Sequence, residues 1–211
     1  MCPKLKWKTK QEVREWIWEK MTAEGIAQFP LPCYGRIPNF IGVEKATQLI
    51  QDLPEFKKAR FIFSAPDFVL HNIRELVLQN RKQLLVATPH MLEFLILNSN
   101  NIPTRMITKA VTIKSMYKFG NKVHLNQISR PLDIFCQGSV ALDRTGNRLG
   151  KGKGYGDREY HLLKQEGIID KQTLLITLIH DVQLIDDFSY LMESNDVKMQ
   201  IALTPSEIIR L

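Results

Sequence analysis

Apolar residues recur at helical spacing in four stretches of the chain. They stand three or four positions apart within residues 13–21, 46–53, 73–77 and 160–163. This spacing places the apolar side chains on one face, which predicts four amphipathic helices. Thr9 together with Glu12 reads as a capping box, so we expect the first helix to begin directly after Thr9.

Short apolar runs lie between these helical stretches. They occupy residues 61–63, 84–87, 132–136 and 174–179, and a final alternating segment covers 197–201. Runs of this length that are rich in aliphatic and aromatic residues predict buried strands. Helices that alternate with buried strands are typical of a parallel sheet covered by helices. We therefore expect an α/β fold with a mostly parallel open sheet, in one domain spanning residues 1–211.

The pattern is weaker in two regions. Met91, Leu92, Leu95 and Ile96 favour a helix, and apolar residues within 106–116 favour another. The polar run 98–101 predicts a loop between them. Near the end of the chain, Thr204-Pro205 should stop the last strand, and Ser206-Glu207 should begin a short terminal helix or tail.

Composition and charge narrow the class of protein. No apolar run approaches the ~20 residues that span a bilayer, and the lysine-rich first ten residues lack the apolar core of a secretion signal. We expect a cytoplasmic protein that does not enter the membrane. The cysteines, Cys2, Cys33 and Cys136, are far apart and form no C-x-x-C, which favours reduced thiols. The net charge of +7 suits anionic substrates or nucleic acid. Because the charge is dispersed, we favour a small anion.

The candidate chemistry is concentrated in residues 146–157, which contain five of the eleven glycines. Glycine at every second position lets the backbone curl so that several N–H groups face one anion. Arg148, Lys151 and Lys153 are interleaved with these glycines, and Asp157 offers an oxygen ligand that suits Mg²⁺. The expected helix at 160–163 would direct the positive end of its dipole at the same anion. The residues predict a phosphate site, whereas the alternative is a flexible turn that carries solvated charges.

Two well-known phosphate motifs do not fit this stretch. The P-loop pattern G-x-x-x-x-G-K-[ST] cannot be written over it. The dinucleotide fingerprint fails as well, because Tyr155 stands where its third glycine would be.

Arg148-Leu149-Gly150-Lys151-Gly152-Lys153-Gly154-Tyr155, followed by Asp157, resembles the signature of the 5-formyltetrahydrofolate cyclo-ligases, also called methenyltetrahydrofolate synthetases. That signature reads R-L-G-x-G-x-G-Y-Y-D, and Gly156 replaces its second tyrosine. The resemblance is closer still to a divergent branch, the synthetase-domain-containing proteins, to which Arg36-Ile37-Pro38-Asn39-Phe40 is also similar. The fold that the resemblance implies is a NagB/RpiA/CoA-transferase-like, Rossmann-like arrangement of three layers.

The resemblance also implies ATP and Mg²⁺ as cofactors and assigns site residues by matching positions. The family's N-terminal K-x-x-x-R matches Lys10 and Arg14, and an N/H-D pair before the last strand matches Asn195-Asp196. The implied nucleotide-binding residues are Lys10, Arg14, Arg148, Leu149, Gly150, Lys151, Gly152, Lys153, Gly154, Tyr155 and Gly156. The implied catalytic residues are Arg148, Lys153 and Tyr155, and the implied metal ligands are Asp157 and Asp196.

The implied reaction is ATP-dependent closure of 5-formyltetrahydrofolate to 5,10-methenyltetrahydrofolate, with a reduced folate as the small-molecule substrate. The folate half departs from the family pattern. Phe68 stands where the family has an acidic residue, with Asp67 one position earlier, and no tryptophan follows Trp18. The alternative is a non-catalytic or altered-substrate protein that binds a nucleotide or, weakly, RNA on the same fold. We expect a monomer or a homodimer.

Two other polar positions need interpretation. His180-Asp181 stands at the end of the most apolar predicted strand, where it can be an acid/base pair, a metal ligand or a structural histidine. Ser139 lacks the G-x-S-x-G context of a nucleophile elbow, which favours a small residue in a packed turn.

Overall fold

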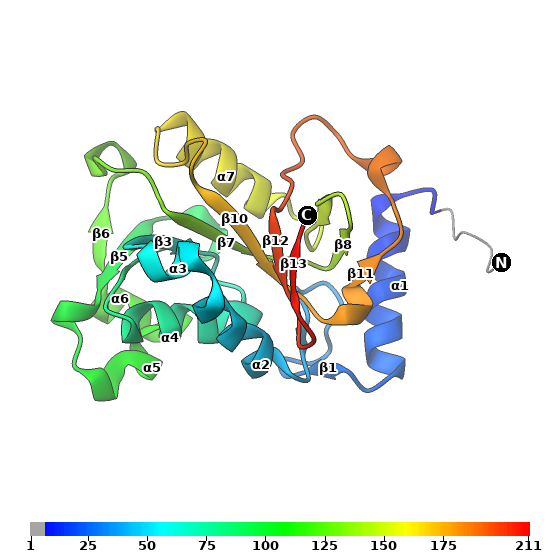
Figure 1. The fold of residues 1–211 in the computed structure, drawn as a ribbon, viewed down its shortest axis with the longest axis horizontal. Helices are drawn as coiled ribbons and strands as arrows, with labels where there is room; N and C mark the ends of the chain where they lie inside the picture. The colour runs from blue at the N-terminus through cyan, green and yellow to red at the C-terminus, as the bar shows by residue number, and fades with distance from the viewer. Residues whose placement is uncertain (1–6) are drawn as a thin grey trace.

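A computed structural model describes residues 7–211, and in this range the largest sheet has eight strands (Figure 1). Their spatial order is β13 (Ile208–Arg210), β12 (Ile201–Leu203), β10 (Leu174–Leu178), β7 (Ile134–Gly138), β3 (Phe61–Ser64), β4 (Gln83–Ala87), β5 (Phe94–Asn98) and β6 (Asn121–Val123). The strands from β12 to β4 pair in parallel, and the remaining pairs at both edges are antiparallel. The predicted α/β fold with a mostly parallel sheet is confirmed.

Two smaller sheets and the helices complete the described chain. The small strands are β1 (Ala27–Gln28) with β2 (Asn39–Phe40), and β11 (Leu184–Ile185), β8 (Ala141–Asp143) and β9 (Arg148–Leu149). The α-helices are α1 (Lys10–Ala23), α2 (Val43–Gln48), α3 (Pro54–Lys58), α4 (His71–Gln79), α5 (Ile107–Ala110), α6 (Ile113–Phe119) and α7 (Tyr155–Gln165). Short 3-10 helices are η1 (Leu49–Asp52), η2 (Phe68–Leu70), η3 (Pro89–Met91), η4 (Ser99–Asn101), η5 (Thr104–Met106), η6 (Leu125–Gln127), η7 (Asp181–Gln183) and η8 (Ser189–Leu191).

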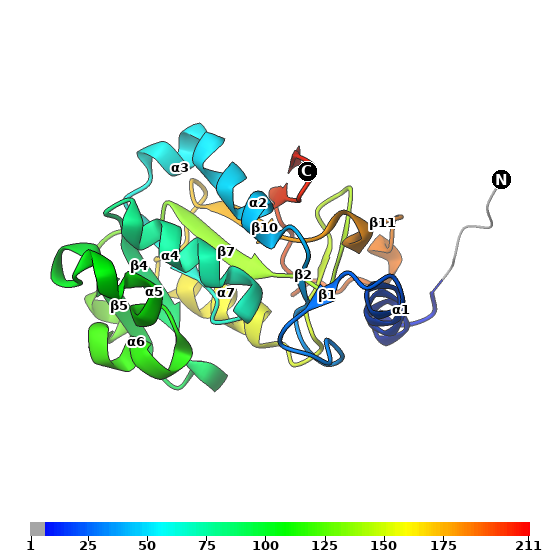
Figure 2. The ribbon, with the colours of Figure 1, turned by 90° about the horizontal axis from the view of Figure 1, so that it is seen from below.

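Helices cover both faces of the large sheet. Figures 1 and 2 show α7 on one face and α2 and α4 on the other, while α1 lies beside β8 and β11. Every residue of β3 and β7 is buried, and Phe63 stacks on Phe135 with ring centroids 4.7 Å apart. Strands buried on both faces need apolar residues at each position, which explains the unbroken apolar runs in the sequence. None of the described helices has the length and apolar character to cross a membrane.

Helix α1 begins where the sequence predicts. The Thr9 hydroxyl oxygen accepts a hydrogen bond from the Glu12 N–H at 3.2 Å, which satisfies one free donor of the first turn. The second half of the predicted capping box is different, because the Glu12 carboxylate accepts from the Lys8 N–H instead. Val13, Ile17 and Met21 are fully buried, so the apolar face of α1 is fixed against the rest of the protein.

Three predictions about local structure are wrong. The proposed helix over residues 91–96 is strand β5, which pairs antiparallel with β4 and buries Phe94, Leu95 and Leu97. The proposed terminal helix or tail is strand β13, which adds to β12. The last parallel strand begins at Ile201 rather than at residue 197. For β5 and β13, the edge of a neighbouring strand was available, and pairing with that edge decided the conformation where the local spacing was ambiguous.

Candidate functional site

The glycine-rich segment forms a loop between β9 and α7, at the edge of the sheet where β7 and β10 end. Gly152 and Gly154 have φ of +90° and +68°, a backbone conformation that residues with a Cβ rarely adopt. Gly154 is the N-cap of α7 and supplies no side-chain acceptor, so the first-turn N–H groups of α7 have none from the cap. Arg158 holds the loop in shape by donating from Nη2 to the Lys153 carbonyl at 2.8 Å. The loop therefore presents amide donors at the start of a helix.

Helix α1 reaches this loop from the opposite end of the chain. Arg14 donates from Nε to the Gly150 carbonyl at 2.7 Å, and a Cβ on Gly152 would lie 3.6 Å from its guanidinium. Lys10, one turn earlier, forms an ion pair with Asp196 at 2.6 Å. The structure thus brings Arg14 to the glycine loop, across 136 positions, and brings Lys10 to the connection that carries Asp196.

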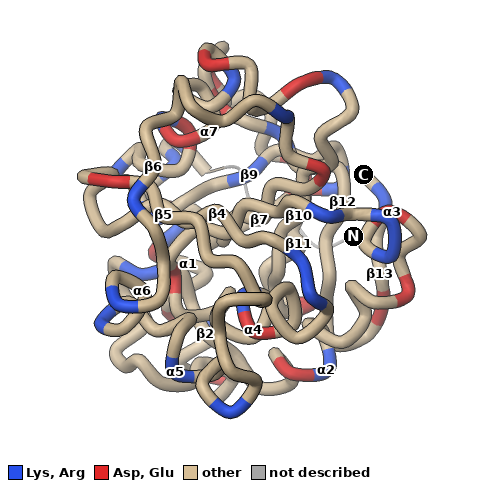
Figure 3. The backbone as a smooth tube through the Cα atoms, turned by 90° about the vertical axis from the view of Figure 1, so that its left-hand side faces the viewer, with Lys and Arg blue, Asp and Glu red and all other residues tan. Residues whose placement is uncertain are grey.

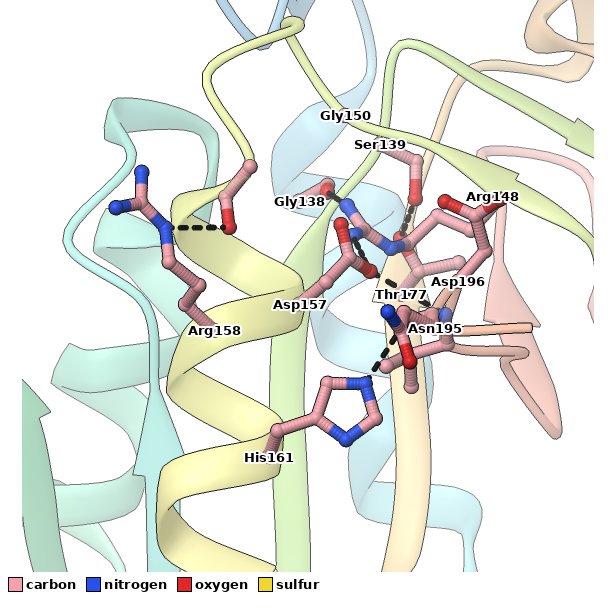
Figure 4. Close-up of polar contacts among 12 residues, drawn as sticks. Gly138, Ser139, Arg148, Gly150, Asp157, Arg158, His161, Thr177, Asn195 and Asp196 are labelled. Carbon is pink, nitrogen blue, oxygen red and sulfur yellow. Dashed lines mark hydrogen bonds and ion pairs between the residues drawn. The ribbon is translucent and has the colours of Figure 1, made fainter. Parts of the chain in front are cut away.

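Arg148 and Asp157 form a partly buried ion pair beneath the loop (Figure 4). The guanidinium of Arg148 is buried, donating to the Gly138 carbonyl at 3.0 Å and to Asp157 Oδ1 at 2.8 Å. The same Oδ1 accepts from the Val197 N–H at 3.3 Å. Because both of these donors hold one oxygen, the Asp157 carboxylate is fixed at the first turn of α7.

Asp196, the second predicted metal ligand, lies on the connection before β12. Its Oδ2 accepts from Lys10 Nζ and from the Glu193 N–H, each at 2.6 Å. The neighbouring Asn195 carbonyl accepts from His161 Nε2 at 2.8 Å, which ties this connection to α7 (Figure 4). Both predicted carboxylates therefore face the same cleft, and each already holds a cation of the protein.

The other wall of the site carries Asp67. Its carboxylate forms an ion pair with Lys151 at 2.7 Å, which bridges the loop to the residues after β3. Buried Arg74 donates to the carbonyls of Ala65 and Asp67 at 2.7 and 3.0 Å, so it holds the backbone of this segment in place. Phe68 is 44% exposed and meets Phe29 edge to face, with centroids 5.5 Å apart.

These elements enclose a cleft of about 870 Å³, which we call the glycine cleft. Part of its lining is cationic and includes Lys10, Arg14, Lys151 and Lys153. Another part is apolar or aromatic and includes Phe29, Phe68, Pro89, Ile113 and Tyr155. The hydroxyl of the predicted Tyr155 lies 3.0 Å from His90 Nδ1. This lining suits a ligand that carries both phosphates and a flat ring.

Two buried polar residues of this cleft, Glu159 and Gln137, were not predicted from the sequence. Glu159 is only 4% exposed, and burial, followed by the charge of Asp67, raises the pKa of its carboxyl to about 8. The Gln137 amide is buried and has no hydrogen-bond partner among residues 7–211. A Cβ on Gly156 would lie 2.2 Å from Gln137 Nε2. In this chain the side chain of Gln137 therefore occupies the space that a Cβ at residue 156 would need.

The remaining polar candidates lie outside the lining of the glycine cleft. His180 Nδ1 accepts from the Val182 N–H at 3.2 Å, and Asp181 accepts from the Thr204 hydroxyl at 2.7 Å. Of the open interpretations, this geometry favours a structural histidine. Ser139 is buried, with its hydroxyl 2.6 Å from that of Thr177, as expected for a packed position.

The sheet and the glycine cleft define the class: an α/β protein whose glycine-rich loop meets cations at the carboxyl edge of a parallel sheet. The model of the 5-formyltetrahydrofolate cyclo-ligase family matches residues 7–205. The chain therefore belongs to this family, and the resemblance seen in its motifs is confirmed.

Relatives place the chain near the branch that its motifs resemble. It is 36% identical over 213 residues to the human methenyltetrahydrofolate synthase domain-containing protein, covering 99% of this chain and 55% of that protein. The mouse protein of the same name is 37% identical over 204 residues, covering 95% and 55%. The chain thus spans about half the length of these relatives. The mitochondrial 5-formyltetrahydrofolate cyclo-ligase of Arabidopsis thaliana is 33% identical over 87 residues, covering 39% of this chain and 31% of that protein.

Solved structures show the same fold at low sequence identity. The 5,10-methenyltetrahydrofolate synthetase of Aquifex aeolicus has a TM-score of 0.58 at 19% identity, covering 96% of this chain and 92% of that one. The synthetase of Mycoplasma pneumoniae has a TM-score of 0.53 at 16% identity, covering 92% and 97%. At these identities the likeness establishes the fold alone.

Proposed function

We propose that this chain is an ATP- and Mg²⁺-dependent cyclo-ligase that converts 5-formyltetrahydrofolate to 5,10-methenyltetrahydrofolate. The observation that carries the proposal is the contact of Arg14 with Gly150, which adds the α1 cations to the glycine loop in one cleft. Membership of the cyclo-ligase family supplies the reaction class. Because the animal relatives are about twice as long, this activity is proposed for the chain and not transferred from them.

The cationic residues of the glycine cleft would hold the triphosphate. Lys153 is exposed in the loop and has no hydrogen bond or ion pair from its side chain within residues 7–211, so it is free to contact a phosphate oxygen. Lys10 and Lys151 would exchange their carboxylate partners for phosphate oxygens. Preorganised cations and helix amides stabilise the charge that develops during phosphoryl transfer.

The carboxylates of the cleft fit Mg²⁺. Mg²⁺ in nucleotide sites is held by one or two carboxylates together with phosphates and water. Asp157 and Asp196 line the cleft with the cations, and the described residues contain no closed group of three or more His, Cys, Asp or Glu side chains that would favour another metal. When bound, Mg²⁺ would neutralise phosphate charge. Arg148, which the family signature implies to be catalytic, would act by positioning Asp157.

The reaction would proceed in two steps. The formyl oxygen attacks the γ-phosphorus of ATP, and the bond to the bridging oxygen breaks to release ADP. The N10 amine then attacks the formyl carbon, loses its proton, and the carbon–oxygen bond breaks to release phosphate. The aromatic and apolar residues of the cleft, Tyr155 among them, would hold the flat ring system and exclude water.

The test is formation of the methenyl product, followed by its absorbance, with ATP, Mg²⁺ and 5-formyltetrahydrofolate present. The proposal predicts product that depends on both ATP and Mg²⁺. Lys153→Ala should slow turnover while the protein remains as stable as the wild type, because Lys153 is exposed and packs against no core. Undiminished turnover in that variant would remove Lys153 from the mechanism, and the absence of product in the wild type would refute the folate substrate.

The second candidate function is phosphoryl transfer to a different acceptor substrate, and the residues around Asp67 favour it. Phe68 is exposed there in place of the family's acidic residue, and the nearby Asp67 carboxylate is held by Lys151. ATP binding without methenyl product would support this candidate. A cytoplasmic location, a monomer or homodimer, and weak nucleic-acid binding stay predictions.

A further inference from the structure

A second cavity, of about 500 Å³, lies at the opposite end of the parallel strands, where β3 and β4 begin. It is enclosed by two segments, one running from α3 into β3 and one from α4 into β4. Its lining residues are Lys57, Lys58, Ala59, Arg60, Asn80, Arg81 and Lys82, and we call it the edge pocket. Because β3 and β4 begin here and end at the glycine cleft, the two cavities open at opposite ends of these strands. Figure 3 shows Lys and Arg segments beside α3 on this side of the molecule.

The charge of the edge pocket is of one sign. Five of its seven lining residues are cationic, and none is acidic. Lys57, Lys58, Arg60 and Arg81 are exposed, and none of their side chains forms an ion pair within the described residues. Like charges held close together repel one another, so their positive potential is available to an anion from solution.

Lys82 forms the floor of the pocket. Its ammonium group is buried, donates to the Ala59 carbonyl at 2.7 Å and lies 4.8 Å from the centre of the Phe56 ring. Burial lowers the pKa of Lys82, while the charge of Asp133 raises it. Lys82 therefore joins the two segments, and the four exposed cations form the rim.

The nearest carboxylates are already satisfied. Asp133 Oδ2 accepts from the N–H groups of Arg60 and Phe61 at 2.7 and 2.8 Å and from Arg130 at 3.0 Å. Glu55 forms an ion pair with Arg210 at 2.9 Å. These partners hold both carboxylates outside the lining of the pocket, where the charge of Asp133 acts on Lys82 and that of Glu55 on Lys58 without forming an ion pair with either.

Two helices end at the edge pocket, and helix carboxyl ends repel anions by about half a charge each. The last carbonyls of α4 are used inside the protein, because Leu76 accepts from Asn80 and Val77 accepts from the Lys82 N–H. Arg81 has φ of +56°, a position after a helix that usually holds glycine. An arginine thus occupies this position despite its positive φ, and five positive charges outweigh two partial negative ones.

We infer that the edge pocket binds a compact, metal-free anion that carries two or more phosphate groups. The size of the pocket suits a small molecule, and cations on two segments can contact separate phosphates at once. No carboxylate lines the pocket to share a metal, so Mg²⁺ should compete with the protein for the ligand. This is the reverse of the glycine cleft, and the inference does not depend on the proposed function.

The test is calorimetric titration with inorganic tripolyphosphate in a metal-free buffer. The probe can also enter the glycine cleft, so we expect two sites in the wild type, one of which weakens when Mg²⁺ is added. Arg60→Gln/Arg81→Gln should weaken that site at least about tenfold, as expected for loss of two charge-assisted contacts. Both side chains are exposed, so the fold should persist. Lys153→Ala should weaken the other site, which separates failure of this inference from failure of the proposed function.

The matched control is Lys45→Gln/Arg144→Gln, which removes two charges from exposed residues outside the edge pocket. Unchanged two-site binding in this control supports the inference. Equal weakening in the control, or wild-type binding by the Arg60/Arg81 variant, would overturn it. A single-stranded RNA oligonucleotide that binds through Arg60 and Arg81 while tripolyphosphate does not would also overturn it, in favour of an extended nucleic-acid ligand.

Discussion

The glycine cleft and the edge pocket, at opposite ends of the parallel strands, carry positive charge in different ways. In the glycine cleft, Lys10, Arg148 and Lys151 each contact a carboxylate from another segment of the chain. In the edge pocket, the exposed cations have no such partners in the part of the chain that the structure describes. Cations mixed with carboxylates suit a phosphate that arrives with a metal, whereas cations alone suit a phosphate without one. The difference teaches that the pairing of charges, more than their number, indicates which form of an anion a site selects.

A large expected effect tests whether the cleft pairs also hold the structure together. Arg148→Met leaves the Gly138 carbonyl and Asp157 without their buried donor. Loss of one partner of a buried ion pair costs about 3–5 kcal/mol, and the partial exposure of Asp157 places our expectation near about 3 kcal/mol. Arg60→Met in the edge pocket should change the free energy of unfolding by less than about 0.5 kcal/mol. Urea denaturation of both variants makes the comparison, and equal losses would contradict it.

A smaller effect tests the tight packing under the cleft. Gly156→Ala should destabilise the protein by about 1–2 kcal/mol, because the new Cβ meets the Gln137 amide. Gln137→Ala removes that obstacle, so the double variant should recover most of the loss. Thermal or urea unfolding of the two single variants and the double variant measures this coupling. Strictly additive effects would show that the two residues are not in conflict.

The dependence of stability on pH should also distinguish the two regions. The pKa of Glu159 is raised to about 8 in the folded state from an ordinary 4.5, so the folded state holds more protons between these values. Stability from this group is therefore full below about pH 4.5 and is lost as the pH rises through 8. Relative to the wild type, Glu159→Gln should gain a few kcal/mol of stability, on the order of 4 kcal/mol at most, by pH 9 and little at pH 5.

Unfolding of the Glu159→Gln variant and the wild type across this range supplies the measurement. Arg81→Gln is the control, since it changes a residue of the edge pocket, at the opposite end of the parallel strands from Glu159. A stability difference between Glu159→Gln and the wild type that stays constant with pH would contradict the raised pKa.

The sequence predicted the parts of the molecule in which local pattern and tertiary packing agree. The buried strands β3, β7 and β10 and the helices α1 and α7 could be read from apolar spacing, since each buries one continuous run or face. Strand β5 could not, because Met91 to Ile96 has helical spacing and only the free edge of β4 makes it a strand. The terminal strand β13 was missed for the same reason.

The candidate site was partly visible in the sequence. The glycines and interleaved cations indicated an anion site, and the family resemblance pointed to Lys10 and Arg14, which lie far from the loop along the chain. The pairing of Lys10, Arg148 and Lys151 with carboxylates could not be predicted, because it depends on segments brought together by the fold. The edge pocket could not be predicted from the sequence either, since its two basic segments are separated by about twenty residues of helix and strand.

The central claim is that the glycine cleft binds the triphosphate of ATP together with Mg²⁺. The most direct measurement is titration of a non-hydrolysable ATP analogue, with and without Mg²⁺, into the wild type, Lys153→Ala and Arg60→Gln/Arg81→Gln. We predict a site that Mg²⁺ strengthens, that Lys153→Ala weakens and that the edge-pocket variant retains unchanged. Mg²⁺-dependent binding that survives Lys153→Ala but disappears in the edge-pocket variant would contradict the account.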